Sequence, residues 1–187
     1  MYQENFLAER LEGKMDQEKK QRKERAQNVL QEIWEHPLYE EAYRQLQEAE
    51  QGRKFCCHSV EHFLDVARLA YIQNLEKGLG IRREVLYAAA LLHDIGKALQ
   101  YKDGIPHETA SAQIAETILN DLGNVFSGEE KAAILQAIRG HRSIRKEQTS
   151  LERLLYECDK KSRLCFICPA EAECKWEQAK KNVEVDR

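Results

Sequence analysis

Apolar residues recur along most of this chain at the three- and four-residue spacing of amphipathic helices. One such helical face is formed by Val60, Phe63, Leu64, Ala67 and Tyr71. Residues 84–95 are apolar almost all round, which is typical of a helix at the centre of a bundle, and Gly96 predicts its end. Because no segment shows a convincing period-two alternation, we predict an all-α fold of roughly six to nine helices.

Local patterns indicate where further helices begin. A Ser-x-x-Glu capping box starts at Ser127, and a Thr-x-x-Glu box starts at Thr149. Pro37 restarts a helical run, so we expect residues 29–50 to be helices packed on the core. Residues 1–28 carry many charges and few apolar positions, which predicts a solvated helix.

The length of 187 residues suits one domain with an appendage. We divide the chain into N-terminal charged helices at 1–50, a central helical domain at 51–163 and a cysteine-rich segment at 164–187.

A net charge of −3 gives no general attraction to nucleic acid or to an anionic membrane. No apolar run approaches the length of a membrane span, and the N-terminus is too charged for a signal peptide. We therefore expect a cytoplasmic protein, in which the 6 cysteines are thiols or metal ligands rather than disulfides.

Histidines and aspartates form the most informative set in the sequence. Imidazole and carboxylate are ligands for iron, manganese, zinc and similar ions, and a helical bundle can present them from several helices at once. The candidates are His58, His93, Asp94, His107, His141 and Asp159. We interpret the remaining His36 and His62 as helix caps or surface residues. Lys97, one turn beyond Asp94, could hold a phosphate oxygen.

The order of these residues resembles the HD superfamily of metal-dependent phosphohydrolases. His58 comes first, His93 and Asp94 lie in Leu-Leu-His-Asp-Ile-Gly-Lys, and Asp159 lies in Cys-Asp-Lys-Lys-Ser-Arg. The match runs from about Phe55 to Arg163 and implies an HD-domain helical bundle in which these four residues bind one metal ion.

His107 and His141 resemble the additional histidines of superfamily members that hold a second metal, with Asp94 bridging the two ions. This layout is similar to that of the bacterial symmetrical diadenosine tetraphosphate hydrolases. It is also similar to that of the cyclic-di-nucleotide phosphodiesterase subgroup, although the Gly-Tyr-Pro signature of that subgroup is absent.

The resemblance implies an enzyme that hydrolyses a phosphoester or phosphoanhydride in a small nucleotide-like substrate. One or two divalent ions (iron, manganese, zinc or magnesium) would lower the pKa of a bound water towards about 7, and the resulting hydroxide would attack phosphorus. Asp94 would orient the nucleophile, and Lys97, Arg139 and Arg142 would neutralise phosphoryl charge.

Two other functions stay open: a di-iron oxygenase of the HD type, and a non-catalytic nucleotide or redox sensor. A basic cluster near the cysteines does not by itself favour nucleic acid as a partner. The exposed N-terminal helices could mediate a homodimer.

Four cysteines near the C-terminus have the spacing Cys-x6-Cys-x2-Cys-x5-Cys: Cys158, Cys165, Cys168 and Cys174. This spacing resembles the four-iron, four-sulfur loop of DNA glycosylases of the endonuclease III type. A 4Fe-4S cluster, a structural zinc ion and unligated thiols all stay open. Cys158 also fits the apolar stripe of its own helix, and Cys56 and Cys57 read as buried thiols.

Overall fold

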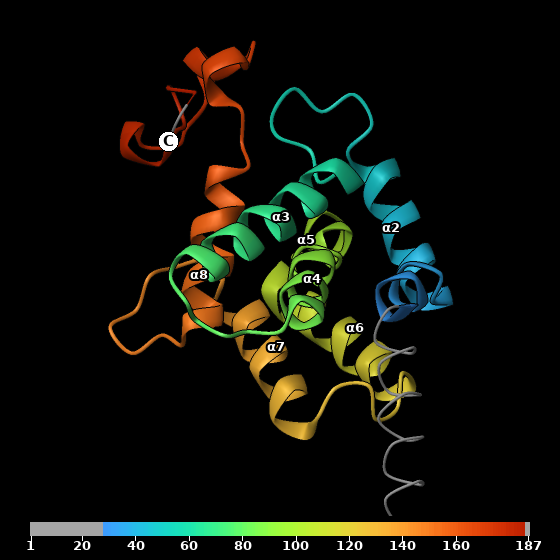
Figure 1. Ribbon diagram of the computed structural model, residues 1–187. Coiled ribbons are helices and arrows are strands. Elements are labelled where there is room, and N and C mark those ends of the chain that lie inside the picture. The colour runs from blue at the N-terminus through green and yellow to red at the C-terminus, as the bar shows by residue number, and fades with distance from the viewer. Residues whose placement is uncertain (1–27, 186–187) are drawn as a thin grey trace, which may run out of the picture.

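Helices make up the regular structure throughout residues 28–185, the part of the chain that the computed structural model describes (Figure 1). No strand occurs within this range, which confirms the predicted all-α class. The solvated helix predicted for residues 1–28 lies almost wholly outside the described residues. Residues 28–34 are helical, and the helices that follow are α2 (Pro37–Ala49), α3 (Val60–Glu76), α4 (Arg83–Leu92), α5 (Lys97–Asp103), α6 (His107–Asp121), α7 (Gly128–Gly140) and α8 (Ser150–Lys161).

The predicted helix starts are confirmed by their capping contacts. Ser127 and Thr149 each form a reciprocal capping box, at the start of α7 and of α8. At α2, His36 caps the helix through Nδ1, which accepts a hydrogen bond from the Leu38 backbone N–H at 3.2 Å, and Pro37 fills the first turn.

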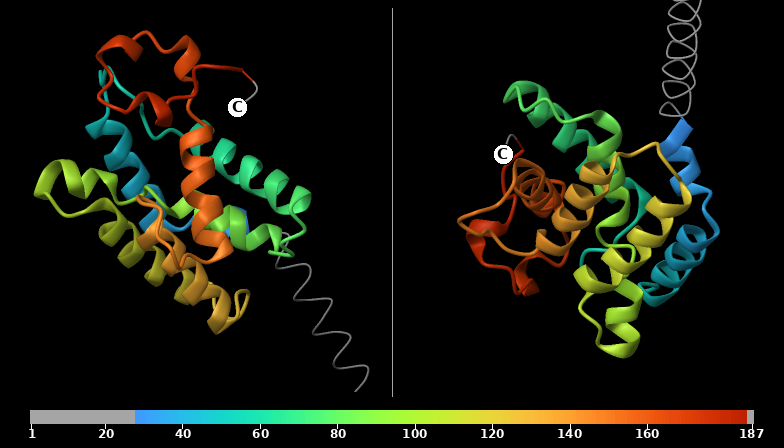
Figure 2. Two further views of the ribbon diagram at one scale, coloured as in Figure 1. Left: turned by 90° about the vertical axis from the view of Figure 1, so that its left-hand side faces the viewer. Right: turned by 90° about the horizontal axis from the view of Figure 1, so that it is seen from below.

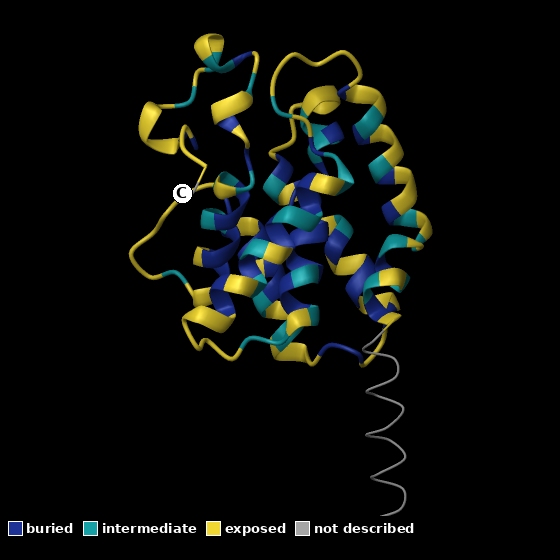
Figure 3. Cartoon of the chain, turned by 45° about the horizontal axis from the view of Figure 1, so that its top comes forward, coloured by how far each residue is buried: buried dark blue, intermediate teal, exposed yellow. Residues whose placement is uncertain are grey.

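Helices α3 and α4 lie at the centre of the bundle, where α3 packs against α4 and α8, and α7 packs against α4, α6 and α8 (Figures 1 and 2). Every residue of α4 from Val85 to Leu92 except Tyr87 is buried, as its all-round apolar sequence predicts. Figure 3 shows these buried inner faces, with the exposed residues on the outer faces and loops.

The helix α4 ends at Leu92, three residues before the predicted end at Ile95, and a turn separates it from α5. Gly96 allows this turn to cross close to helix α6. Its N–H donates to Ser111 Oγ at 2.9 Å, and a Cβ at Gly96 would lie 2.4 Å from the backbone nitrogen of Ser111. The close approach brings the turn that follows α4 against helix α6.

The N-terminal residues described here share the core of the central domain. Val29, Ile33 and Leu46 are fully buried, and the Tyr39 hydroxyl donates to the Leu91 carbonyl at 3.2 Å. The expectation that residues 29–50 pack on the core is therefore confirmed.

The C-terminal segment beyond α8 contains three short 3-10 helices: Cys165–Ile167, Glu171–Glu173 and Gln178–Lys180. It lies beside the loop that joins α2 to α3 (Figures 1 and 2). Within the described residues, none of the helices has both the length and the apolar character needed to cross a bilayer.

Candidate metal centre

The ends of five helices bring imidazoles and carboxylates together in the middle of the bundle. His62 lies in the first turn of α3, His93 and Asp94 follow α4, His107 begins α6, His141 follows α7 and Asp159 lies in the last turn of α8. All six are buried. This convergence from several helices is how a bundle builds a metal site.

The six side chains form two groups that share Asp94. The ligand atoms of each group lie within 4.8 Å of one another, and the groups are His62, His93, Asp94 and Asp159, and then Asp94, His107 and His141. On one side, His93 Nε2 lies 3.2 Å from Asp94 Oδ2, and His62 Nε2 lies 3.4 Å from Asp159 Oδ1. On the other side, His107 Nε2 lies 3.1 Å from Asp94 Oδ1. Asp94 therefore presents a different oxygen to each group.

The imidazoles are oriented by hydrogen bonds at Nδ1. The partners are Ser162 Oγ for His62 (3.0 Å), the Ala90 carbonyl for His93 (2.7 Å), Gln100 Oε1 for His107 (2.6 Å) and the Ile138 carbonyl for His141 (2.6 Å). A carbonyl can only accept, so Nδ1 carries the proton in His93 and His141. The lone pair at Nε2 then faces the carboxylates, which is the usual arrangement of metal-binding histidines.

Unpartnered buried atoms test whether this group fits a metal ion. Among the described residues, His93 Nε2 and Asp94 Oδ1 are buried without a hydrogen-bond partner. An orphaned acceptor in a buried site is costly unless a proton or a cation meets it. The donor set of imidazole nitrogens and carboxylate oxygens suits divalent iron, manganese or zinc, so the residues fit such an ion.

Cations of the chain already contact two side chains of this group, Asp159 and His62. Lys160 Nζ lies 2.5 Å from Asp159 Oδ2, and Arg163 Nη2 lies 2.9 Å from His62 Nε2. Both side chains would have to yield these contacts to a bound ion.

The electrostatics of the group agree with this interpretation. Burial alone would raise the pKa of Asp94, but His93 and His58 outweigh it and hold that pKa well below its usual range. Burial likewise would lower the pKa of His93, yet Asp94 and Asp159 raise it to about 9. A divalent cation would take the place of the proton on His93. Burial lowers the pKa of His107 to about 3, so this imidazole is neutral and able to coordinate.

The structure places two histidines differently from the prediction. His62 is buried and faces Asp159, so its interpretation as a cap or surface residue is wrong. His58 does not belong to the four-residue group. Its Nε2 lies 3.3 Å from Asp94 Oδ2, while its Nδ1 donates to Glu50 Oε1 at 2.6 Å.

Glu50 was not found from the sequence. It is buried at the end of α2, where Oε2 accepts from the His58 N–H at 2.6 Å and Oε1 accepts from the Tyr101 hydroxyl at 2.8 Å. A glutamate at the end of a helix looks the same in the sequence whether its side chain is buried or exposed to solvent. No sequence signal could therefore have identified Glu50.

A cavity of about 570 Å³ opens onto this group. Asp94, His58, His107 and His141 line it from the metal side. The cationic residues on its wall are Lys97, Arg142, Lys160, Arg163, Lys175 and Lys180. Trp176 lines the same cavity from the C-terminal segment.

The structure places two of the three cations proposed for substrate binding at this cavity. Lys97 is half-buried, and its Nζ lies 3.1 Å from His107 Nδ1; burial lowers its pKa. Arg142 pairs with Glu108 at 3.2 Å. Arg139 is exposed beside Glu116 on the outer surface and does not line the cavity, so the structure does not support a role for it in substrate binding.

The four predicted cysteine ligands do not come together as a set. Cys158 is fully buried in the apolar core, where Gln73 Nε2 lies 3.4 Å from its sulfur. Cys165, Cys168 and Cys174 line a different cavity, and Cys158 does not. Cys56 is partly exposed and Cys57 is exposed, so the interpretation of both as buried thiols is wrong.

Comparisons with known proteins agree with this architecture. A crystal structure of a protein described as a predicted HD superfamily hydrolase, from an uncultured Thermotogales bacterium, matches with a TM-score of 0.54. It is 21% identical and covers 77% of this chain and 81% of its own, so the two proteins share a fold. An uncharacterised protein of Clostridium beijerinckii is 46% identical over 136 residues, which are 73% of this chain and 84% of that protein. The HD domain model matches residues 59–164, and the chain belongs to the HD domain family.

Proposed function

We propose that this protein is a metal-dependent hydrolase that cleaves a phosphoester or phosphoanhydride bond in a small nucleotide-like substrate. The observation that carries this proposal is the cationic cavity of about 570 Å³ that opens onto the histidine–aspartate group. Six lysines and arginines line it, against the carboxylates of Asp94, Asp159 and Glu177. A wall with this charge attracts phosphate, whereas the chain as a whole carries a net charge of −3. The neighbour from the Thermotogales bacterium, described as a hydrolase, also supports the reaction class.

The proposed metal ligands are His62, His93, Asp94 and Asp159 for one ion, and Asp94, His107 and His141 for a second. Divalent ions held there supply Lewis acidity, which acidifies water near neutral pH and offsets phosphoryl charge. The chain itself contributes the fixed orientation of each imidazole through its Nδ1 hydrogen bond.

The remaining residues of the cavity would bind and orient the substrate. Lys97 and Arg142, which line the wall next to His107 and His141, would contact phosphoryl oxygens. Lys175 and Lys180 would hold more distant charge of the same substrate. The ring of Trp176 offers a surface on which a base could stack, worth about 1–3 kcal/mol.

His58 is proposed to move a proton. It lines the cavity, its Nδ1 donates to the buried Glu50, and its Nε2 lies 3.3 Å from Asp94 Oδ2. An imidazole held by a carboxylate at one nitrogen can accept a proton at the other, as in other general-base pairs.

Product formation from a panel of nucleotides and dinucleotides, separated by chromatography and measured without oxygen, tests the proposal. We expect turnover that stops with a chelator and returns on addition of manganese or iron. Lys175→Ala should raise KM about tenfold with little change in kcat. The matched control is Lys131→Ala. Lys131 lies near the start of α7, whereas His141 follows the other end of that helix.

Turnover only in the presence of oxygen would favour the di-iron oxygenase instead. Absence of turnover on every substrate, with tight nucleotide binding, would favour the sensor.

A further inference from the structure

The C-terminal segment has almost no core of its own. Within residues 164–182, the buried apolar side chains are Cys165 and Ala170, while Leu164 and Ile167 are 57% and 66% exposed. Its helices are single 3-10 turns of three residues each. Segments this short usually need a crosslink or a metal to hold one conformation, and all the cysteines of the described chain are free.

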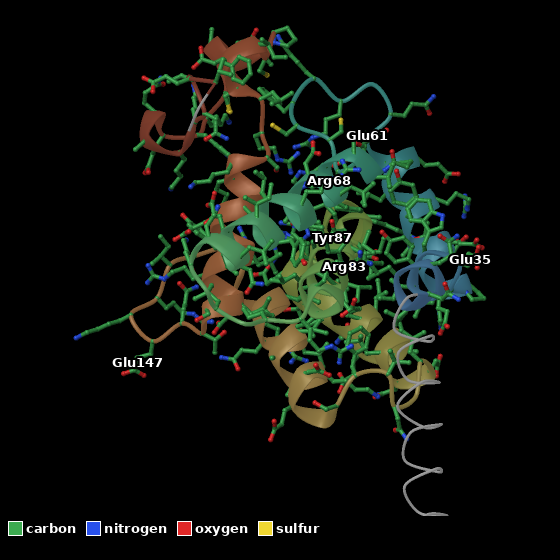
Figure 4. The ribbon with its side chains drawn as sticks, viewed as in Figure 1. Glu35, Glu61, Arg68, Arg83, Tyr87 and Glu147 are labelled. Atoms are coloured by element: carbon green, nitrogen blue, oxygen red, sulfur yellow. The ribbon has the colours of Figure 1, made fainter. Side chains whose placement is uncertain are left out.

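Four cysteines line one cavity of about 390 Å³ between this segment and the loop that precedes α3. Three come from the segment, Cys165, Cys168 and Cys174, and the fourth is Cys56. Figure 4 shows sulfur atoms on both sides of the space between these two stretches of chain.

The backbone of the segment presents its cysteines in a repeated way. Cys168 and Cys174 each follow a 3-10 turn and have extended conformations, with φ of −73° and −69°. The Cys168 N–H donates to the Cys165 carbonyl at 3.2 Å, so one turn joins the two cysteines of the Cys-x2-Cys pair. On the other side of the cavity, the Arg163 guanidinium donates to the Cys57 carbonyl at 2.8 Å and fixes the loop that carries Cys56.

Charge around the cavity suits bound thiolates. Three cations, Lys54, Arg163 and Lys181, line it together with the cysteines, against two carboxylates, Asp65 and Glu171. Burial raises the pKa of Cys56, and the nearby thiols of Cys168, Cys165 and Cys174 raise it further, while Arg163 opposes them. A cationic centre bound at this point would favour the thiolate form of Cys56 and offset its burial.

We propose that Cys56, Cys165, Cys168 and Cys174 hold an iron–sulfur cluster that fastens the C-terminal segment to the loop ahead of α3. The four thiols bind as thiolates and release their protons. Compared with the sequence prediction, Cys56 replaces Cys158, which is buried in the core beside Gln73.

The four thiols are not already gathered as tightly as a single zinc ion requires. Tetrahedral zinc with Zn–S bonds of about 2.3 Å brings its sulfurs to about 3.8 Å from one another. Among the described residues, the only groups of three or more ligand atoms within 4.8 Å of one another are the two histidine–aspartate groups. In a cubane cluster each thiolate binds a different iron, so the sulfurs lie on the order of 6 Å apart. Phe55, Ile167 and Trp176 line the cavity and would shield the cluster from water.

The cluster would also shape the substrate cavity. Lys175, Trp176 and Lys180 follow Cys174 in the chain and line the cavity at the metal centre. By holding the segment in place, the cluster would position this wall.

Acid-labile sulfide in the full-length protein, purified without oxygen, tests this inference independently of the histidine-bound ions. We expect about four sulfides per chain in the wild type, and the same in Cys57→Ser and Cys158→Ser. Cys56→Ser should lose sulfide at least about fivefold. Mass-mapped alkylation of the folded wild type needs no variant: Cys57 should react, whereas Cys56, Cys168 and Cys174 should be protected although none of them is fully buried.

Three results would overturn the inference. One is zinc in place of iron and sulfide, and another is ready alkylation of Cys56, Cys168 and Cys174. The third is sulfide that survives Cys56→Ser and is lost in Cys158→Ser. None of these results bears on whether the histidine–aspartate group hydrolyses a phosphoester or phosphoanhydride bond.

Discussion

At the scale of single residues, two neighbouring histidines have different surroundings. His62 does not line the cavity at the metal centre and belongs to the group with His93 and Asp159. His58 lies on the cavity wall, held by Glu50. Four positions in the chain separate them, yet we propose different roles for the two: metal binding for His62, which faces Asp159, and proton transfer for His58, which pairs with Glu50.

Replacement of His62 tests the first of these roles. His62→Ala should lower the metal bound after gel filtration at least about tenfold, because it removes one of the donors of a four-residue group. His36→Ala is the matched control, since His36 caps α2 and lies outside both groups. The assignment is wrong if His62→Ala keeps its metal while His58→Ala loses it.

Glu50 is predicted to act by positioning His58. Glu50→Gln should reduce kcat about 10–100-fold at unchanged metal content, because the amide no longer holds the proton on Nδ1 of His58 as strongly. The change should also shift the basic or acidic limb of the kcat profile against pH, which a purely structural role would not do. An unchanged profile would contradict this role.

The sequence supplied most of the donors but not their full set. His93, Asp94 and Asp159 were predicted as ligands because their order along the chain resembles that of the HD superfamily. His62 was missed because the apolar face predicted for α3 is rotated by about one residue from the face that is buried. The buried face contains His62, Val66 and Ala70. A stripe traced from His62 at four-residue steps would have placed it inside.

At the scale of elements, the contact between α5 and α6 sets the geometry of the centre. Gly96→Ala should destabilise the fold by about 1–3 kcal/mol, because the added Cβ would overlap the α6 backbone at Ser111 and Ala110. Urea unfolding measures the change. Gly128→Ala is the matched control, since its Cβ meets open space at the start of α7 and should be neutral or slightly stabilising. Equal stability of the two variants would contradict the account of this crossing.

Glu152 ties α8 to its surroundings. Its buried carboxylate accepts hydrogen bonds from the Thr149 N–H and from Gln136 Nε2, both at 2.9 Å, and pairs with Arg145. Burial would raise its pKa, but hydrogen bonds, those from Thr149 first, lower it below its ordinary value of 4.5. The carboxylate therefore stabilises the fold above pH 4.5, and this contribution is lost as the pH falls through the lower folded-state pKa.

Glu152→Gln should cost about 1–3 kcal/mol of unfolding free energy at pH 7, and the difference from wild type should shrink in acid. Urea unfolding at both pH values measures it. Glu147→Gln on the preceding loop is the control, because Glu147 is exposed and points away from the fold (Figure 4). A difference that grows in acid would have the wrong sign.

Elements were predictable where local chemistry determines them. The capping boxes at Ser127 and Thr149 fixed the starts of α7 and α8. The end of α4 was placed too late because a tertiary contact, the approach of Gly96 to Ser111, ends the helix before its apolar run does.

At the scale of the whole molecule, the cavity combines parts that lie far apart in the sequence. Lys97 follows α4, Arg142 follows α7, and Lys175 lies in the C-terminal segment. Composition could not reveal this cationic wall, because the charges of the whole chain sum to −3. For the same reason Arg139, three residues before Arg142, could be separated from it only by structure.

Titration of metal-depleted protein with Mn²⁺, followed by the loss of the free-ion signal, tests the central claim that the group around Asp94 is a metal centre. Manganese prefers imidazole and carboxylate over thiolate, so the cysteines should not compete. We expect about two equivalents in wild type and about one in His107→Ala. No saturable binding in wild type, or binding that Asp94→Asn leaves unchanged, would contradict the claim.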